Sequence, residues 1–217
     1  MKRFSLIAVV LLIVVMVSAQ QDEKAKNILD QVSRETRSFK AFSADFAFTM
    51  QNKEMDIHER NEGTIKIKDQ KYRIELPGAG ITVFSDGSTL WNYMKEGNQV
   101  TISNIDNESN ELMNPSSIFS IYEKGFKSKF VSETKVGTEV IYNIDLFPDN
   151  INKQEVSKVS ISIYKETMMI YSATLYGTDG NLYGIEVKKM EPNRDFPDSD
   201  FVFNAGKYTD VEIIDFR

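Results

Sequence analysis

The stretch Ile81-Thr82-Val83-Phe84-Ser85-Asp86-Gly87-Ser88-Thr89-Leu90-Trp91-Asn92-Tyr93 decides the fold. Two β-prone arms flank Asp86-Gly87, a pair that favours a two-residue hairpin turn because both turn positions need a positive φ. The register that follows pairs Phe84 with Thr89, Val83 with Leu90, and Thr82 with Trp91. Phe84 and the only tryptophan, Trp91, then share one face of the hairpin, and Val83 and Leu90 share the other. A hairpin that is apolar on both faces has to be covered on both sides.

Period-two alternation predicts further strands on both sides of this hairpin. The apolar positions that alternate with polar ones are Phe42, Ala44, Phe46, Phe48 and Met50; Ile65 and Ile67; Tyr72, Ile74 and Leu76; Val100 and Ile102; Val140, Tyr142, Ile144 and Leu146; Val159, Ile161 and Ile163. A second hairpin is expected around Asp179-Gly180, with Tyr171, Ala173 and Leu175 before it and Tyr183, Ile185 and Val187 after it. About ten or eleven strands result. Such a long antiparallel meander tends to curl into a barrel or half-barrel.

Two helices accompany the strands. Residues 22–37 carry apolar side chains at helical spacing, with Asp22 and Glu23 in the first turn, where acidic groups suit the helix dipole. Pro115 to Tyr122 is predicted as a short helix capped by Asn114. One apolar stripe per strand points inward, so the two helices are left to close the opening of the half-barrel.

Residues 1–19 have the pattern of a secretory signal peptide. Lys2 and Arg3 precede an apolar run from Ile7 to Val17, and Val17-Ser18-Ala19 provides a small-residue cleavage site. The alternative, an uncleaved membrane anchor, fits less well because the run is short for a membrane span. Cleavage leaves residues 20–217 as a single domain. The chain has no cysteine, so we expect neither a disulfide nor a lipid attached to an N-terminal cysteine.

The net charge of the chain disfavours some classes of ligand. The formal net charge is −6, and it becomes more negative once Lys2 and Arg3 are removed with the signal peptide. An acidic protein is repelled by nucleic acid and by anionic lipid surfaces. We therefore expect a ligand that is apolar, or a partner whose contact surface is basic.

Signals for enzymatic chemistry are weak. His58 is the only histidine and lies in a polar stretch that is expected to connect two strands, where a solvated side chain is the simplest interpretation. No nucleophile elbow, phosphate-binding glycine loop or Cys/His metal spacing occurs. Asp195, Asp198 and Asp200 could meet Ca²⁺, but they lack the ligand spacing of a calcium loop, and a turn with a helix cap explains them better. We predict no catalytic residue, metal or cofactor.

The same residues carry a resemblance to a known family. Ser-Asp-Gly-x-Thr-Leu-Trp-x-Tyr at 85–93 resembles the central hairpin of the periplasmic outer-membrane lipoprotein carriers, the LolA family. Phe42-Ser43-Ala44-Asp45-Phe46 resembles the family's first strand, Asn114-Pro115-Ser116-Ser117-Ile118-Phe119 falls where the family has a short helix, and Asp200-Phe201-Val202-Phe203 resembles the Phe-x-Phe near its C-terminus. The resemblance implies an incomplete antiparallel β-barrel covered by a helical lid.

The resemblance also implies a function and a set of site residues. It implies a monomeric periplasmic carrier that takes acylated lipoproteins from an inner-membrane transporter to an outer-membrane acceptor. The implied lipid-binding cavity comprises Phe42, Phe46, Phe48, Met50, Ile65, Ile67, Phe84, Trp91 and Tyr93. The implied lid comprises Ile28, Leu29, Val32, Ile118, Phe119 and Ile121. The family's latch arginine and its neighbouring proline are not matched. Lys68 or Arg73 can substitute as the latch; otherwise a looser lid or a different release partner is expected.

Three alternatives stay open from the residues alone. The aromatic stripe of Phe42, Phe46 and Phe48 can be packed as solid core instead of lining a cavity. The domain can act as a periplasmic sensor of lipids or lipoproteins. It can also be a secreted β-domain that binds proteins through its sheet edges.

Overall fold

A computed structural model describes residues 22–105, 125–149 and 156–217. The predicted signal peptide (residues 1–19) and the predicted helix of residues 115–122 lie outside these ranges. In the part of the chain that the structure describes, no helix is both long and apolar enough to cross a membrane.

The described residues form one helix, residues 22–38, and twelve strands that belong to a single sheet. The strands are β1 (Ala41–Asn52), β2 (Ile57–Lys68), β3 (Lys71–Leu76), β4 (Ile81–Ser85), β5 (Thr89–Met94), β6 (Gln99–Asn104), β7 (Phe126–Val136), β8 (Glu139–Pro148), β9 (Val156–Tyr164), β10 (Ile170–Gly177), β11 (Leu182–Pro192) and β12 (Glu212–Asp215). The described ranges also contain three short 3₁₀ helices: η1 (Pro77–Ala79), η5 (Asp198–Phe201) and η6 (Ala205–Lys207).

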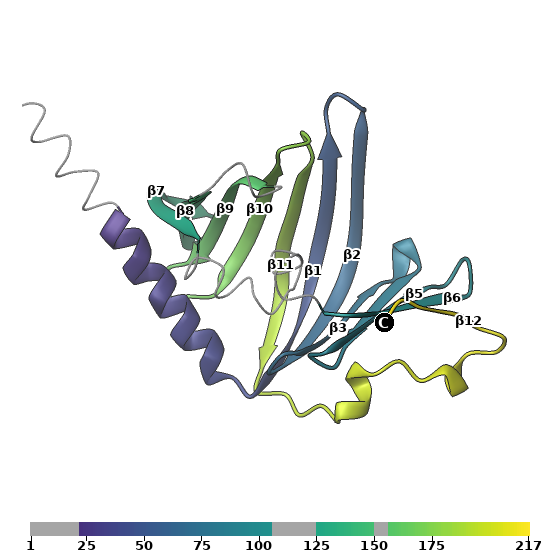
Figure 1. Ribbon diagram of the computed structural model, residues 1–217. Coiled ribbons are helices and arrows are strands. Elements are labelled where there is room, and N and C mark those ends of the chain that lie inside the picture. The colour runs from purple at the N-terminus through teal and green to yellow at the C-terminus, as the bar shows by residue number, and fades with distance from the viewer. Residues whose placement is uncertain (1–21, 106–124, 150–155) are drawn as a thin grey trace, which may run out of the picture.

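The sheet is open and curved, as Figure 1 shows. Its strand order is β12-β6-β5-β4-β3-β2-β1-β11-β10-β9-β8-β7, so β1 pairs with β11 and joins the two halves of the chain. All neighbours are antiparallel except β12, which runs parallel to β6. Because β7 and β12 end the sheet without pairing to each other, the fold is an incomplete barrel, as predicted from the sequence.

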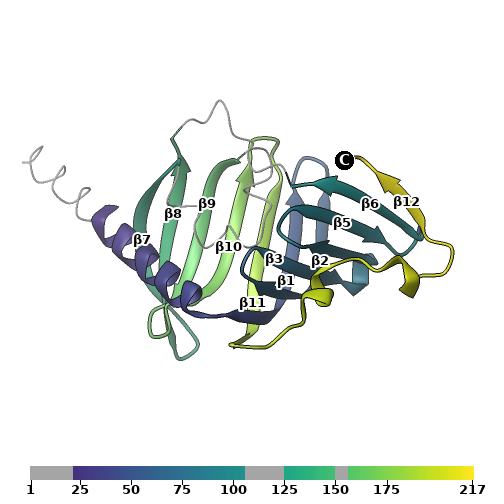
Figure 2. The same ribbon diagram turned by 60° about the horizontal axis from the view of Figure 1, so that its bottom comes forward.

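The helix of residues 22–38 covers one end of one face of the sheet, which we call the inner face (Figure 2). Its apolar stripe packs on β8, β9 and β10 in the largest buried cluster. Leu29 is only 1 % exposed and meets side chains such as Ile144 and Ile161. The 3.6-residue spacing of the stripe therefore places one helix side against the apolar positions of three strands.

The other face, which we call the outer face, is covered at the opposite end of the sheet. Residues 193–211, the C-terminal segment, run from β11 past β3 to β12 (yellow in Figures 1 and 2). The ring of Phe203 packs on Phe84 and Tyr93, with ring centroids 5.8 Å apart in both pairs. Phe201, 0 % exposed, packs with Phe196 and Ala41. The hairpin of β4 and β5 is thus covered by aromatic residues more than a hundred positions away.

The two-sided character of this hairpin is confirmed, but its predicted register is wrong. The structure pairs Phe84 with Trp91, not with Thr89, and Ser85 with Leu90. The Asp86 carboxylate accepts hydrogen bonds from the backbone N–H groups of Ser88 (2.9 Å) and Thr89 (2.7 Å). These bonds stabilise a longer turn than the two-residue one. Because the register moves by two residues, every side chain keeps its face.

Three local predictions also need correction. Strands β7 and β12 were not predicted, and they bring the total among the described residues to twelve instead of ten or eleven. His58 lies within β2 and not in a connection, although its side chain is exposed as expected. The alternation of β2 becomes polar near its start, at Ile57-His58-Glu59-Arg60, which explains why the pattern resembled a loop.

Candidate functional site

The inner face carries a continuous apolar surface across β1 to β4. Phe42 lies opposite Ile67 and Ala44 opposite Ile65, so β1 and β2 present their apolar residues on one face. The same face continues through Ile65 opposite Ile74, and through Ile74 opposite Val83. Ile65, Ile74 and Val83 are only half-buried. The surface therefore has apolar side chains that the described elements leave partly open.

β11 and β10 extend this surface on the other side of β1. Phe46 pairs with Val187, Phe48 with Ile185 and Met50 with Tyr183, and β10 adds Ala173 and Leu175. The rings of Phe48 and Tyr183 stack with centroids 6.5 Å apart. A bulge between Asp45 and Phe46 shifts the register there, which bends the strand locally. From β11 to β5 the surface crosses five strand spacings of about 4.8 Å, or roughly 24 Å in all.

Gly63 makes room for the ring of Phe46. A Cβ atom on Gly63 would lie 2.8 Å from Cζ of Phe46 and 2.7 Å from the Glu75 carbonyl oxygen. The Phe46 ring therefore extends over β2 at the one position without a side chain, and it is 8 % exposed. A residue that lacks Cβ allows this close approach.

The structure separates the nine residues that were expected to line one cavity. Phe42, Phe46, Phe48, Met50, Ile65 and Ile67 share the inner face. Phe84, Trp91 and Tyr93 lie on the outer face, because Phe84 pairs with Arg73, whose neighbours Tyr72 and Ile74 point inward. The expectation of a shared interior is thus corrected for these three. The alternation of Lys71, Arg73 and Glu75 with the apolar residues of β3 was the sequence signal for their placement.

The expected lid residues divide in a similar way. Ile28, Leu29 and Val32 are buried in the cluster with β8, β9 and β10. Ile118, Phe119 and Ile121 lie outside the described residues. The helix of residues 22–38 thus covers one end of the inner face and leaves the β1–β4 part to other contacts.

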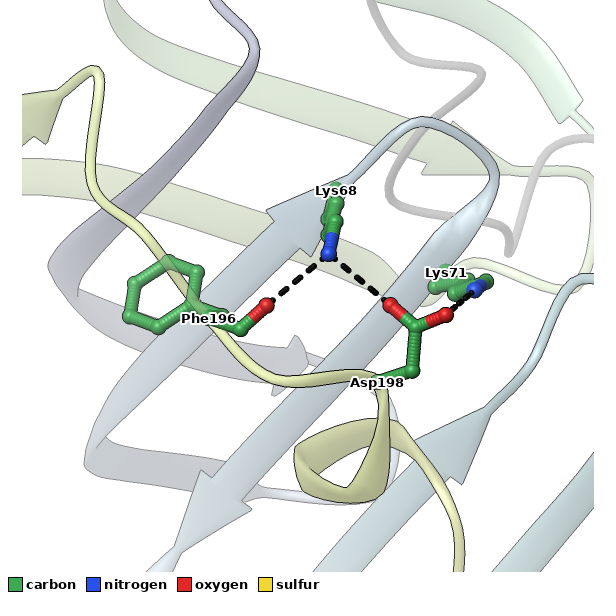
Figure 3. A network of polar contacts seen from close by, with 4 residues as sticks. All are labelled: Lys68, Lys71, Phe196 and Asp198. Atoms are coloured by element: carbon green, nitrogen blue, oxygen red, sulfur yellow. Dashed lines mark hydrogen bonds and ion pairs between the residues drawn. The ribbon is translucent and has the colours of Figure 1, made fainter.

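The two expected latch residues lie on the outer face. Lys68 donates hydrogen bonds to the Phe196 carbonyl oxygen (2.9 Å) and to Asp198 Oδ1 (2.8 Å), while Lys71 contacts Asp198 Oδ2 (2.6 Å), as Figure 3 shows. Lys68 therefore holds the C-terminal segment and not a lid over the inner face. Arg73 pairs with Glu75 (2.7 Å) and lies over the Phe84 ring.

Asp198 and Asp200 are paired with lysines. Hydrogen bonds from Lys68 and then Lys71 lower the pKa of Asp198 to about 2. Asp200 pairs with Lys66 at 2.8 Å. Both aspartates lie in η5, close to the expected turn and helix cap. Among the described residues, no group of three or more His, Asp or Glu side chains could hold a metal ion.

The outer face also has a polar depression of about 250 Å³ over β11. Gly184 and Ala47 line it, together with Arg60 and Glu186, whose side chains form an ion pair at 4.0 Å. Charged and hydroxyl-bearing residues line it, so its chemistry differs from that of the apolar inner face. Its other lining residues are Thr49, Tyr171, Ser172, Thr174 and Ile185.

The sequence matches the family model described as outer membrane lipoprotein carrier protein LolA over residues 37–204. The chain belongs to the LolA family. The match spans strands β1 to β11 and continues into the C-terminal segment as far as Asn204. It therefore includes the strands that form the apolar inner face and most of the segment that covers the outer face. The family resemblance seen in the sequence is therefore confirmed.

A solved protein structure shares the fold of this chain. An uncharacterized conserved protein from Thermus thermophilus matches with a TM-score of 0.58 at 14% identity, covering 88% of this chain and 99% of that one. A LolA superfamily protein from Nitrosomonas europaea (TM-score 0.44, 13% identity) covers 82% of this chain and 97% of its own. Lipoprotein LppX from Mycobacterium tuberculosis (TM-score 0.46, 11% identity) covers 79% and 98%. No curated protein sequence matches this LolA-family chain.

Proposed function

We propose that this protein is a periplasmic carrier that binds the acyl chains of lipoproteins on the inner face of its half-barrel. The half-buried apolar surface of β1 to β4 and β11 supports this most directly, because apolar groups left partly open on a curved sheet can be covered by a hydrocarbon chain. Membership in a family described as lipoprotein carriers agrees with it.

The free energy of binding expected for an acyl chain is large enough for a carrier. Each methylene group that leaves water contributes about 0.8 kcal/mol. A long acyl chain lying along the surface between β11 and β5 would bury many methylenes against Phe48, Ile65 and Val83. Several chains on one cargo would bind more tightly still.

The position of the helix of residues 22–38 indicates which part of the inner face is open to acyl chains. The helix of residues 22–38 is packed on β8 to β10, so we place the acyl chains on the β1–β5 part of the inner face. We further propose that residues 1–19 direct export and are removed, and that a monomer receives cargo from an inner-membrane transporter and delivers it to an outer-membrane acceptor. The protein then acts by binding and not by catalysis.

Two neighbouring residues of β2 provide a matched test. Ile65 lies on the inner face and Thr64 on the outer face, where it is exposed. Ile65→Glu should abolish saturable binding of a fluorescent acyl ligand, because it places a carboxylate in the apolar surface, while Thr64→Glu should bind like the wild type. Circular dichroism checks that both variants are folded, and Met50→Glu serves if Ile65→Glu is not.

Cargo should also be found directly. Protein purified from the periplasm should release acyl-chain lipids or acylated polypeptide on organic extraction and mass spectrometry. Equal binding by the Ile65→Glu and Thr64→Glu variants, or wild-type protein free of acyl material that also fails to bind an added acyl ligand, would contradict the proposal.

A further inference from the structure

The inner face changes from apolar to polar at β5 and β6. On β4 and β5 it carries Val83 and Leu90, both half-buried. The next residues on the same face are Asn92, which lies opposite Thr101, and Ser103, which lies opposite Leu90. The apolar surface therefore ends in a strip of three neutral polar side chains.

These three side chains have no hydrogen-bond partner within the described parts of the chain. Asn92, Thr101 and Ser103 are half-buried, and none of their side chains forms a hydrogen bond there. Ser85 on the same face is different, because it is fully buried and its hydroxyl accepts a hydrogen bond from the backbone N–H of Gly87 (3.1 Å). Half-buried amide and hydroxyl groups without a protein partner are open to water or to a ligand.

The strip is also uncharged. The charged residues of β3 (Lys71, Arg73 and Glu75) lie on the outer face, because they alternate with Tyr72 and Ile74. An anionic group placed at the strip would lose hydration without meeting a positive charge, because the charged side chain beside the strip on β12 is the Glu212 carboxylate, which accepts a hydrogen bond from Gln99 (3.0 Å). A neutral ester could instead accept hydrogen bonds from Asn92, Thr101 and Ser103, and a neutral amide could both accept and donate them.

We propose that the ligand carries a neutral amide or ester next to its acyl chain, and that this group binds at Asn92, Thr101 and Ser103 while the chain runs across β4 toward β1 and β11. This inference rests on the proposed function and adds the class and orientation of the ligand. Amide and ester groups join the acyl chains of an acylated polypeptide to its backbone, so such a cargo has the required chemistry.

The inner face has a second polar place, at the free end of the β1–β2 hairpin. Asn61 lies opposite Phe48 there, and Glu59 lies opposite Met50. The Glu59 carboxylate would favour a cationic group over a neutral one. The two places therefore predict different ligands and opposite orientations.

Cross-linking distinguishes the two orientations. Two N-hexadecanoyl-glycinamide probes are needed, one with a diazirine beside the amide and one with a diazirine at the end of the chain. The amide-side probe should label residues 89–104, and the chain-end probe should label residues 41–52 and 182–192. Labelling of residues 57–61 by the amide-side probe, or the same pattern for both probes, would overturn the orientation. No saturable labelling of any inner-face residue would instead contradict the proposed function itself.

The preference for a neutral amide over a carboxylate can be tested by comparing the affinities of two ligands. Wild-type protein should bind N-hexadecanoyl-glycinamide up to about tenfold more tightly than hexadecanoate, the difference that about one net hydrogen bond supplies. Asn92→Leu and Thr101→Val should reduce this ratio toward one, whereas Thr64→Val on the outer face should leave it unchanged. A wild-type protein that binds hexadecanoate as tightly as the amide, or a ratio unaffected by both inner-face variants, would overturn the inference.

Discussion

Phe84 and Trp91 lie directly opposite each other on β4 and β5, on the face of the sheet that points away from the helix of residues 22–38. They form one buried cluster with Val100, Ile102 and Phe203. The only tryptophan of the chain therefore reports on the docking of the C-terminal segment, and it is separated from the proposed ligand by the sheet.

The first prediction concerns this reporter. Adding an acyl ligand should leave the Trp91 emission maximum unchanged, because ligand and indole lie on opposite faces. A Trp91→Phe/Phe48→Trp variant, whose single indole lies on the inner face, should show a blue shift on binding. A saturable shift in the wild type together with none in the variant would place the ligand on the outer face.

The second prediction concerns acid. The pKa of Asp198 is lowered to about 2 by hydrogen bonds from Lys68 and Lys71. A carboxyl whose folded pKa is below its unfolded value of about 3.9 contributes stability that is present above pH 4 and is lost as the pH falls through about 2. Docking of the C-terminal segment, followed by Trp91 fluorescence, should therefore weaken over this interval.

The Asp198→Asn variant isolates this contribution. It lacks the titrating group, so its docking signal should change less than that of the wild type between pH 4 and pH 2. The Glu96→Gln variant removes an exposed carboxyl from the β5–β6 turn and should follow the wild type. Superimposable curves for wild type and Asp198→Asn would show that the lysine contacts do not hold the segment.

The third prediction concerns the close approach at Gly63. Gly63→Ala should lower the free energy of unfolding by about 1–3 kcal/mol, because the new methyl group would meet the Glu75 carbonyl oxygen and the Phe46 ring. Gly97→Ala is the control, since its Cβ would meet only Cβ of Gln99 at 3.8 Å. Denaturant unfolding of both variants gives the comparison, and equal stabilities would mean that the Phe46 ring is free to move away.

The fourth prediction concerns the helix of residues 22–38. Leu29→Ala should cost about 2–5 kcal/mol of unfolding free energy, as expected for a large side chain in a packed core. Lys26→Ala on the exposed side of the same helix should change stability by less than about 0.5 kcal/mol. If Leu29→Ala is as mild as Lys26→Ala, the helix is a loosely held lid and not part of the core.

Structural features that depend on the local alternation of apolar and polar residues were predictable from the sequence. The faces of the β4–β5 hairpin were assigned correctly relative to each other even though the register was wrong, since a shift of two residues preserves the alternation. The register depended on the Asp86 carboxylate, whose hydrogen bonds to Ser88 and Thr89 compete with a two-residue turn. The helix of residues 22–38 followed from its apolar spacing alone.

Long-range partners were not predictable in the same way. The contact between Lys68 and Asp198 joins residues 130 positions apart, and no local pattern encodes it. The aromatic residues of the C-terminal segment have no strand or helix period, because they lie in and around short 3₁₀ helices. Without this cover in view, Phe84, Trp91 and Tyr93 were assigned to the wrong face of the sheet.

The location of the bound acyl chain can be measured by NMR with a spin-labelled fatty-acyl ligand on protein with labelled isoleucine methyl groups. We predict stronger, saturable broadening of Ile65, Ile74 and Ile185 on the inner face than of Ile102, which packs under the C-terminal segment on the outer face. An excess of unlabelled ligand should restore the broadened signals. Broadening of Ile102 without Ile65 and Ile74, or equal broadening of all methyl groups, would contradict binding on the inner face.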